Sequence, residues 1–77
     1  MISVKVLAPV ISRSKTQRKN FEVSYREGIM ALDVILEEFS EDDSRKIFVM
    51  VNGKQVRKDA ILSDGDGVVM GLVVSGG

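Results

Sequence analysis

Hydrophobic and polar residues alternate in two stretches of the first third of the chain, and this spacing predicts two β-strands. Apolar side chains occupy every second position over residues 2–6 and again over residues 21–25. We expect the first strand to end at Pro9, which cannot donate to a sheet ladder. The polar residues 13–20 form a loop between the two strands, which we therefore expect to pair as a hairpin.

The next stretch has the spacing of an amphipathic helix. Apolar residues fall at i, i+3, i+4 and i+7, at Leu32, Ile35, Leu36 and Phe39. This predicts one helix from about Met30 to about Phe39, with these four side chains facing the core. The opposite face is expected to be solvated and carries Asp33, Glu37 and Glu38.

The second half of the chain predicts three more strands and two turns. Residues 47–51 form a compact apolar strand, and Asn52-Gly53 is the dipeptide that a type I′ hairpin turn prefers. Gln55 and Val56 begin the return strand. Ile61 and Leu62 are expected to anchor a connection across the sheet, and the turn at residues 64–67 precedes a final strand at residues 68–74.

This order of elements predicts an α+β fold of the β-grasp, or ubiquitin-like, type: a ββαββ mixed sheet with one main helix packed on one face. The right-handed crossover rule places the first and last strands side by side at the centre, if they run parallel. We expect one domain over residues 1–72 and an extended tail over residues 73–77. Val69, Gly71 and Val73 can be buried within the domain or form an exposed apolar patch, and the sequence favours neither.

Composition excludes several classes of function. The 77 residues include no cysteine and no histidine, so Ser-His-Asp and Cys-His catalysis and a structural zinc site are excluded. The formal charge is zero, which argues against nucleic-acid binding. No apolar stretch is long enough to span a bilayer and no secretory signal is visible, so we expect no membrane association and a cytoplasmic location.

Charged residues are unevenly distributed, and solvated surface is the favoured interpretation of each cluster. The segment 13–19 is basic, and the segment 37–43 is acidic. Asp64 and Asp66 resemble the start of a calcium loop, but the closing glutamate is missing and a turn explains them better. The acidic helix end at Glu37, Glu38 and Asp42 could bind a divalent cation weakly. We predict no metal site.

The chain ends in Gly76-Gly77, directly after the final apolar strand. Two residues without Cβ atoms are thin enough to enter a narrow channel in another protein. An extended chain from Val73 to Gly77 reaches about 17 Å, at roughly 3.3–3.6 Å per residue. The tail could therefore carry the functional group, the terminal carboxylate; the alternative is a flexible end without function.

The closing pattern of the chain resembles that of the sulfur-carrier proteins, both the small subunit of molybdopterin synthase and the thiamine-pathway sulfur carrier. The similarity is carried by Leu62, by Gly65-Asp66, by the apolar strand, and by Gly76-Gly77 eleven positions after the aspartate. Val51-Asn52-Gly53 is similar to the hairpin of the thiamine carriers. The chain lacks the proline pair that molybdopterin-synthase small subunits usually place before the tail, so both pathways stay open.

The resemblance implies that the protein is a carrier and co-substrate rather than an enzyme. An adenylating (E1-like) enzyme would join the Gly77 carboxylate to AMP, using ATP, and sulfur from a donor would then replace AMP to give a thiocarboxylate. The acceptor would be a molybdopterin synthase large subunit or a thiazole synthase. The partner channel would hold Gly76, Ser75, Val74 and Val73, and no cofactor would be bound.

Two other functions remain open on the sequence. A ubiquitin-like protein modifier would form an isopeptide bond between Gly77 and a target lysine, and it would use the same tail and activation step. A β-grasp interaction module would not use its carboxylate at all. Deletion of Gly77 separates the module from the other two functions, because only the module would keep its activity.

Overall fold

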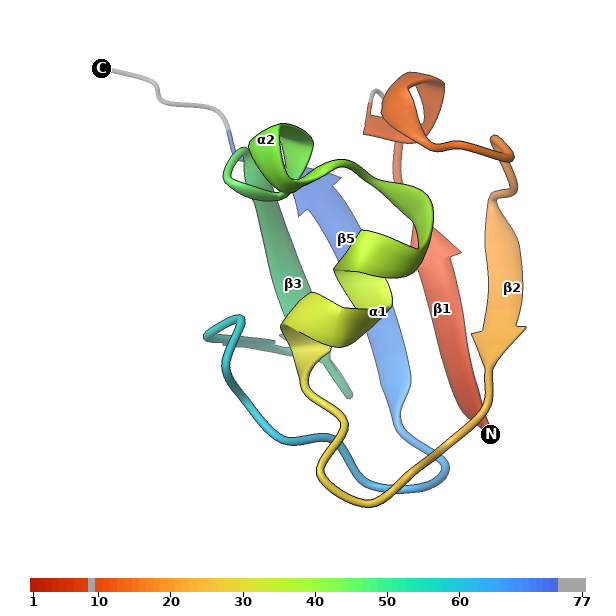
Figure 1. Cartoon of the computed structure of the whole chain (residues 1–77), viewed down its shortest axis with the longest axis vertical. Helices are drawn as coiled ribbons and strands as arrows, with labels where there is room; N and C mark the ends of the chain where they lie inside the picture. Colours follow the sequence, from red (N-terminus) through yellow and green to blue (C-terminus); the bar gives the residue numbers. More distant parts are fainter. Residues whose placement is uncertain (9, 74–77) are drawn as a thin grey trace.

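The structure is a computed structural model that describes residues 1–8 and 10–73, so Pro9 and residues 74–77 lie outside it. Five strands and three short helical segments are present among the described residues (Figure 1). They are β1 (Ile2–Val6), the 3₁₀ segment η1 (Val10–Arg13), β2 (Asn20–Val23), α1 (Ala31–Glu38), α2 (Glu41–Ser44), β3 (Ile47–Val51), β4 (Lys54–Val56) and β5 (Gly67–Leu72).

The strands form one mixed sheet in the order β2-β1-β5-β3-β4. β1 and β5 are parallel, whereas every other neighbouring pair is antiparallel. Helix α1 crosses one face of the sheet (Figure 1). The predicted β-grasp fold is confirmed, and so is the central position of the first and last strands.

Both predicted hairpins form. β1 and β2 pair antiparallel with Ile2 opposite Val23. β2 ends at Val23, earlier than the alternation predicts, because β1 begins at Ile2 and offers no partner to Tyr25, which is 39% exposed. At the β3–β4 turn, Asn52 and Gly53 have φ values of 51° and 86°. Both are positive, as a type I′ turn requires.

Helix α1 is present, and its predicted core face is confirmed in part: Ile35 and Phe39 are buried, Leu32 is half-buried and Leu36 is exposed. The buried residues are Ala31, Val34, Ile35 and Glu38. These also stand at i, i+3, i+4 and i+7, in the same pattern moved back by one residue. Leu36, predicted to face the core, is 38% exposed. The fourth buried residue is the acidic Glu38. A search for apolar residues at helical spacing therefore does not detect this buried face.

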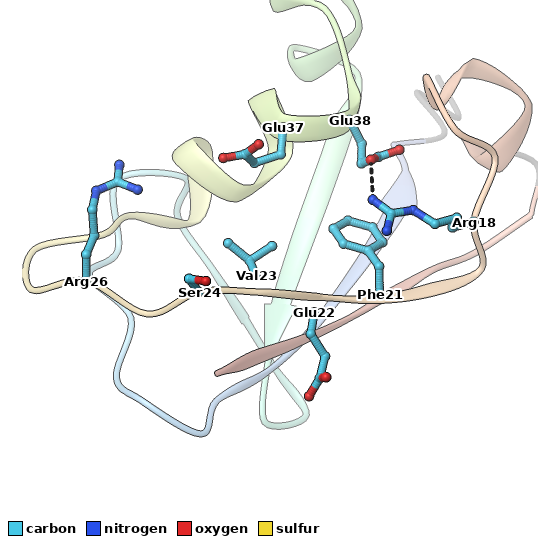
Figure 2. A pocket seen from close by; sticks show the side chains of 8 residues that line it. All are labelled: Arg18, Phe21, Glu22, Val23, Ser24, Arg26, Glu37 and Glu38. Carbon is cyan, nitrogen blue, oxygen red and sulfur yellow. Dashed lines mark hydrogen bonds and ion pairs between the residues drawn. The ribbon is translucent and has the colours of Figure 1, made fainter.

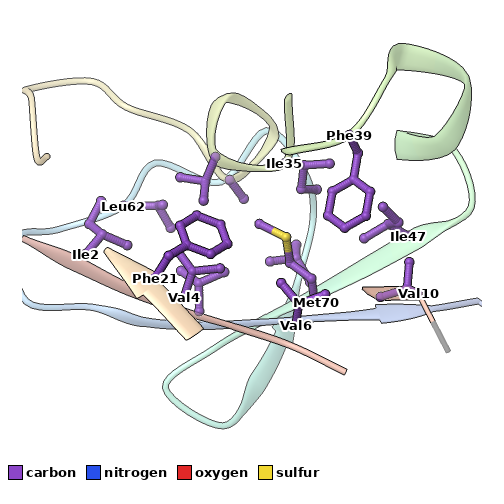
Figure 3. Close-up of a cluster of buried hydrophobic side chains, with 14 of the residues drawn as sticks. Ile2, Val4, Val6, Val10, Phe21, Ile35, Phe39, Ile47, Leu62 and Met70 are labelled. Atoms are coloured by element: carbon purple, nitrogen blue, oxygen red, sulfur yellow. The ribbon is translucent and has the colours of Figure 1, made fainter. Parts of the chain in front are cut away.

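The core lies between α1 and the sheet (Figure 3). The alternate residues of β1 point into it, as do Val68 and Met70 of β5 and Ile47 and Val49 of β3. Phe39, which follows α1, is 1% exposed and packs in the same cluster. Leu62 is buried as predicted, while Ile61 is exposed and makes an isolated bridge with Met30.

Two helical segments were not predicted. η1 follows β1 and buries Val10 completely, so the connection before the basic segment is part of the core. α2 occupies the acidic connector, where the Ser40 hydroxyl accepts the Asp43 N–H at 3.2 Å and caps the first turn. Acidic residues in that turn also interact favourably with the helix dipole.

Candidate functional site

At the C-terminal end of β5, the two neighbouring strands direct their next ladder groups to other partners. On one side, Val73 N–H donates to the Lys46 carbonyl at 2.7 Å, but Lys46 N–H donates to Asp43 at the end of α2. On the other side, Leu7 N–H donates to Met70, while the Leu7 carbonyl accepts the N–H of Ile11. Val73 is therefore the last residue with a ladder bond among those that the structure describes.

Of the five predicted tail residues, the structure places one. Val73 is 49% exposed and follows the last residue of β5 directly. Val74, Ser75, Gly76 and Gly77 lie outside the described residues. The roles assigned to these positions, and the division of the chain at residue 73, stay predictions.

The face of β5 opposite the core carries a short apolar surface next to this end. Side chains alternate along a strand, so Val69 and Gly71 point away from Val68 and Met70. Phe48 of β3 lies directly opposite Gly71, and a Cβ on Gly71 would come within 2.5 Å of the Phe48 ring. Gly71 is thus buried by Phe48.

The sequence left two alternatives for Val69, Gly71 and Val73, burial within the domain or an exposed apolar patch. Each alternative describes some of these residues. Gly71 is buried within the domain, Val69 is half-buried, and Val73 is exposed. Phe48 and Met50 are half-buried on the same face, since they alternate with the core residues Ile47 and Val49. We name Phe48, Met50, Val69 and Gly71 the tail-side apolar surface. The sequence signal for it was the glycine within an apolar strand, which often marks a close approach.

Glu38 is not solvated as predicted; it is 3% exposed and lies at the centre of a hydrogen-bond cluster. Its Oε2 accepts the Ser14 hydroxyl at 2.6 Å, the Thr16 hydroxyl at 2.7 Å and the Thr16 N–H at 3.2 Å. Its Oε1 accepts Arg18 Nη2 at 2.9 Å (Figure 2). The Arg18 guanidinium also lies 4.7 Å from the centre of the Phe21 ring.

These contacts set the ionisation of Glu38. Burial alone raises the pKa of a carboxyl group, but hydrogen bonds from Ser14, Thr16 and Arg18 stabilise the charged form and together outweigh burial. They lower the pKa of Glu38 from 4.5 to about 2. The carboxylate is therefore fully ionised near neutral pH, with its charge compensated.

The cluster gives the basic segment 13–19 a fixed position. The Glu38 carbonyl also accepts the Lys15 N–H at 2.8 Å, and Arg13 pairs with Asp43 of α2 at 3.2 Å. The segment thus packs on the ends of both helices, at the end of the sheet where β5 stops (Figure 1). Glu38 is the organising residue that the sequence pattern missed. The run of hydroxyl and basic residues in segment 13–19 was the available signal.

Other functional sites find no support in the described residues. Over residues 1–8 and 10–73, no group of three or more acidic side chains is arranged to hold a metal ion. Asp66 instead accepts the Ser63 N–H at 2.8 Å and the Asn52 amide at 3.0 Å, as expected of a turn. In the same part of the chain, no helix has both the length and the apolar character needed to cross a membrane.

The fold defines a ubiquitin-like protein, a β-grasp domain whose last described residue, Val73, is exposed. A family model matches residues 4–77 of the chain. The chain therefore belongs to the ThiS family of ubiquitin-like sulfur carriers. The match extends through Gly77 and so includes the whole tail.

A solved structure shares the fold. The crystal structure of SAMP1 from Haloferax volcanii matches with a TM-score of 0.71, and the match covers 99% of this chain and 98% of that one. The sequences are 18% identical, so this likeness shows the fold alone. No curated protein matches the chain.

Proposed function

We propose that this protein carries sulfur as a thiocarboxylate on Gly77, for use by a biosynthetic enzyme. The observation that carries the proposal is the family match, which continues past the end of β5 to the last residue. The exposure of Val73, the last described residue with a ladder bond, supports it. The protein acts as a co-substrate, and the catalytic groups belong to its partners.

The terminal carboxylate needs activation before it can accept sulfur. With a reference pKa of about 3.3–3.7 it is ionised near neutral pH, and a carboxylate is a poor electrophile. A separate adenylating enzyme binds ATP: the carboxylate attacks the α-phosphate, and pyrophosphate leaves. A persulfide of the donor then displaces AMP at the carbonyl carbon to give an acyl disulfide, and a second thiol attacks its S–S bond, forms a disulfide with the donor sulfur and releases the thiocarboxylate. Because this chemistry requires ATP, we propose a cytoplasmic location.

The chain itself contributes access and orientation. Gly76 and Gly77 pass into the active-site channel of the partner, where residues with Cβ atoms would be too wide. Val73, Val74 and Ser75 line the approach to that channel. The tail-side apolar surface docks against the partner and fixes where the tail begins, since Phe48 and Val69 lie directly next to the last strand residues.

The ThiS match favours an acceptor of the thiazole-synthase type over the large subunit of molybdopterin synthase. The same carrier chemistry serves both acceptors. Which of the two acceptors this carrier serves depends on the surface that each acceptor presents to the β-grasp domain.

Adenylation provides the test. The full chain is incubated with ATP and a ThiS-type activating enzyme, and the release of pyrophosphate is followed. We expect release with the full chain and none with a chain lacking Gly77. Equal release from both chains, or none from either with the protein folded, would contradict the proposal.

A further inference from the structure

β2 forms an open edge of the sheet. It is the outermost strand in the order β2-β1-β5-β3-β4, and no segment that the structure describes runs along its outer side (Figure 1). Val6 N–H donates to the Lys19 carbonyl at 2.8 Å, so the odd-numbered residues of β2 bond to β1. Asn20 and Glu22 therefore direct their N–H and C=O groups outwards. Both residues are exposed, and these groups have no hydrogen-bond partner among residues 1–8 and 10–73.

A hollow of about 310 Å³ lies beside this edge, between β2 and the C-terminal end of α1 (Figure 2). Phe21 and Val23 point into it from β2, and Glu37 borders it on α1. Each arginine that lines it already pairs with an acidic side chain of its own chain. Glu37 makes no ion pair with any described residue. The hollow therefore offers an apolar floor and the uncompensated charge of Glu37.

The charges along this edge change sign from one end to the other. Lys19 precedes β2 directly, whereas Glu22 lies near its far end, and Figure 2 shows Glu37 above Val23. Lys19, Glu22 and Glu37 are exposed, and none has an ion pair in the described part of the chain. Charges on an edge strand usually keep other strands away. An antiparallel second copy, however, brings the positive end of each edge to the negative end of the other.

We propose that the β2 edge pairs with the β2 edge of a second copy, antiparallel and about a two-fold axis. Free backbone groups occur only at even-numbered residues, so each must face an even-numbered residue of the other copy. An axis at Asn20 or at Val23 would leave most of the strand unpaired. An axis at Glu22 would set this residue against itself, with like charges directly opposite. An axis at Phe21 pairs Asn20 with Glu22 of the second copy, and this is the register that we assign.

In this register the exposed side chains complement one another. Asn20 lies directly opposite Glu22 of the second copy, whose carboxylate can accept a hydrogen bond from the Asn20 amide. Lys19 lies directly opposite Val23 of the second copy. Its aliphatic stem covers the floor of that copy's hollow, and its ammonium reaches Glu37 at the rim. The two-fold axis repeats each of these contacts.

The pairing joins the two sheets into one of ten strands, five from each copy. The two copies of β5 run in opposite directions, so the ends from which the two tails continue lie far apart in the dimer. The β2 edge is also separated from β5 by β1. Association therefore leaves both copies of Val73 uncovered, and the proposal does not rest on the sulfur function.

The concentration dependence of the full chain tests the pairing. So short an edge buries little surface, and we expect a Kd on the order of 1 mM. ¹⁵N spectra, hydrogen exchange and translational diffusion are recorded from about 20 µM to about 2 mM, which spans this Kd. As the concentration rises, the amides of Asn20 and Glu22 should shift and gain protection, and diffusion should slow. Changes confined to other residues, or no changes, would overturn the proposal.

Charge reversal tests the register. Lys19→Glu should weaken association about tenfold, and so should Glu37→Lys, because each variant sets like charges against each other at both contacts. An equimolar mixture of the two variants should associate about as well as the wild type, since opposite charges then meet at both contacts. Lys54→Glu, at an exposed site on the far edge strand, is the control and should associate normally. A mixture that does not recover, or a control that weakens equally, would refute the register.

A proline tests whether the backbones pair. Glu22→Pro removes the outward N–H, and proline is tolerated in an edge strand where the N–H faces solvent. Unchanged resonances of β3 and β4 show that the variant is folded. It should lose association, whereas Glu22→Gln keeps the N–H and an acceptor for Asn20 and should retain it. Equal association of the two variants would show that the copies do not pair as strands, and would overturn the proposal.

Discussion

The Phe48 ring occupies the space that a side chain on Gly71 would need. The two residues are direct cross-strand partners, and a Cβ at Gly71 would lie 2.5 Å from Phe48 Cε1 and 2.6 Å from Cζ. Leu7 Cδ1 is 3.4 Å from the same point. The absence of a side chain at position 71 thus allows the aromatic ring to cover the last strand just before the tail.

Substitution of Gly71 tests this packing. Gly71→Ala should force the ring off β5 and lower the free energy of unfolding by about 1 kcal/mol, near the lower end of overpacking costs because the half-buried ring can move. Urea denaturation measures the loss. In a Phe48→Leu background the same substitution should cost less; an equal cost in both backgrounds would show that the ring is not the obstacle.

Glu38 should be needed for the position of the basic segment. Glu38→Gln keeps the shape but removes the charge that Arg18 pairs with, and its amide NH₂ cannot accept hydroxyl donors. We expect a loss of about 2 kcal/mol, the range for hydrogen bonds to charged groups. Glu37→Gln, at the exposed neighbouring position, is the control and should change stability by less than about 0.5 kcal/mol. Similar losses in both variants would refute a special role for Glu38.

The lowered pKa of Glu38 predicts an acid-dependent loss of stability. A carboxyl group with a lower pKa in the folded state than in the unfolded state stabilises the fold above the unfolded value. This contribution is on the order of 3 kcal/mol, from a pKa of 4.5 falling to about 2. It should be complete above about pH 5 and decline as the pH falls towards 2. Stability curves of wild type and Glu38→Gln should therefore converge in acid; a constant gap would contradict the assignment.

Asn52 connects the β3–β4 hairpin to the turn before β5. Its amide donates to Asp66 at 3.0 Å, its carbonyl oxygen accepts the Gly67 N–H at 2.9 Å, and its φ of 51° suits few other residues. Asn52→Ala should therefore cost about 1–2 kcal/mol. Thermal or urea unfolding measures it, with exposed Lys54→Ala as the control. A cost no larger than that of the control would mean that these bonds do not stabilise the fold.

The sequence predicted the fold well because its patterns are local. The Asn52-Gly53 turn, the alternation in β1 and the apolar run of β5 each need only neighbouring residues. The buried face of α1 was predicted only in part, because Glu38 occupies a core position and its partners in the segment 13–19 are distant in sequence. α2 had a usable signal, Ser40 followed by Asp43, which is a capping pattern.

The site was predictable only in part. The glycine pair and its distance from Asp66 indicate a functional tail, but the last described ladder bond, at Val73, depends on hydrogen bonds made by Leu7 and Lys46. Those bonds link η1 and α2 to the strand ends, and neither segment was predicted.

Intact mass shows whether Gly77 carries sulfur, as we propose. The full chain is incubated with ATP, a ThiS-type activating enzyme and a sulfur donor, beside a chain that lacks Gly77. We predict a gain equal to the exchange of one oxygen for one sulfur, in the full chain only. No gain in a folded, full-length chain with an activating enzyme that adenylates it, or the same gain without Gly77, would contradict the account.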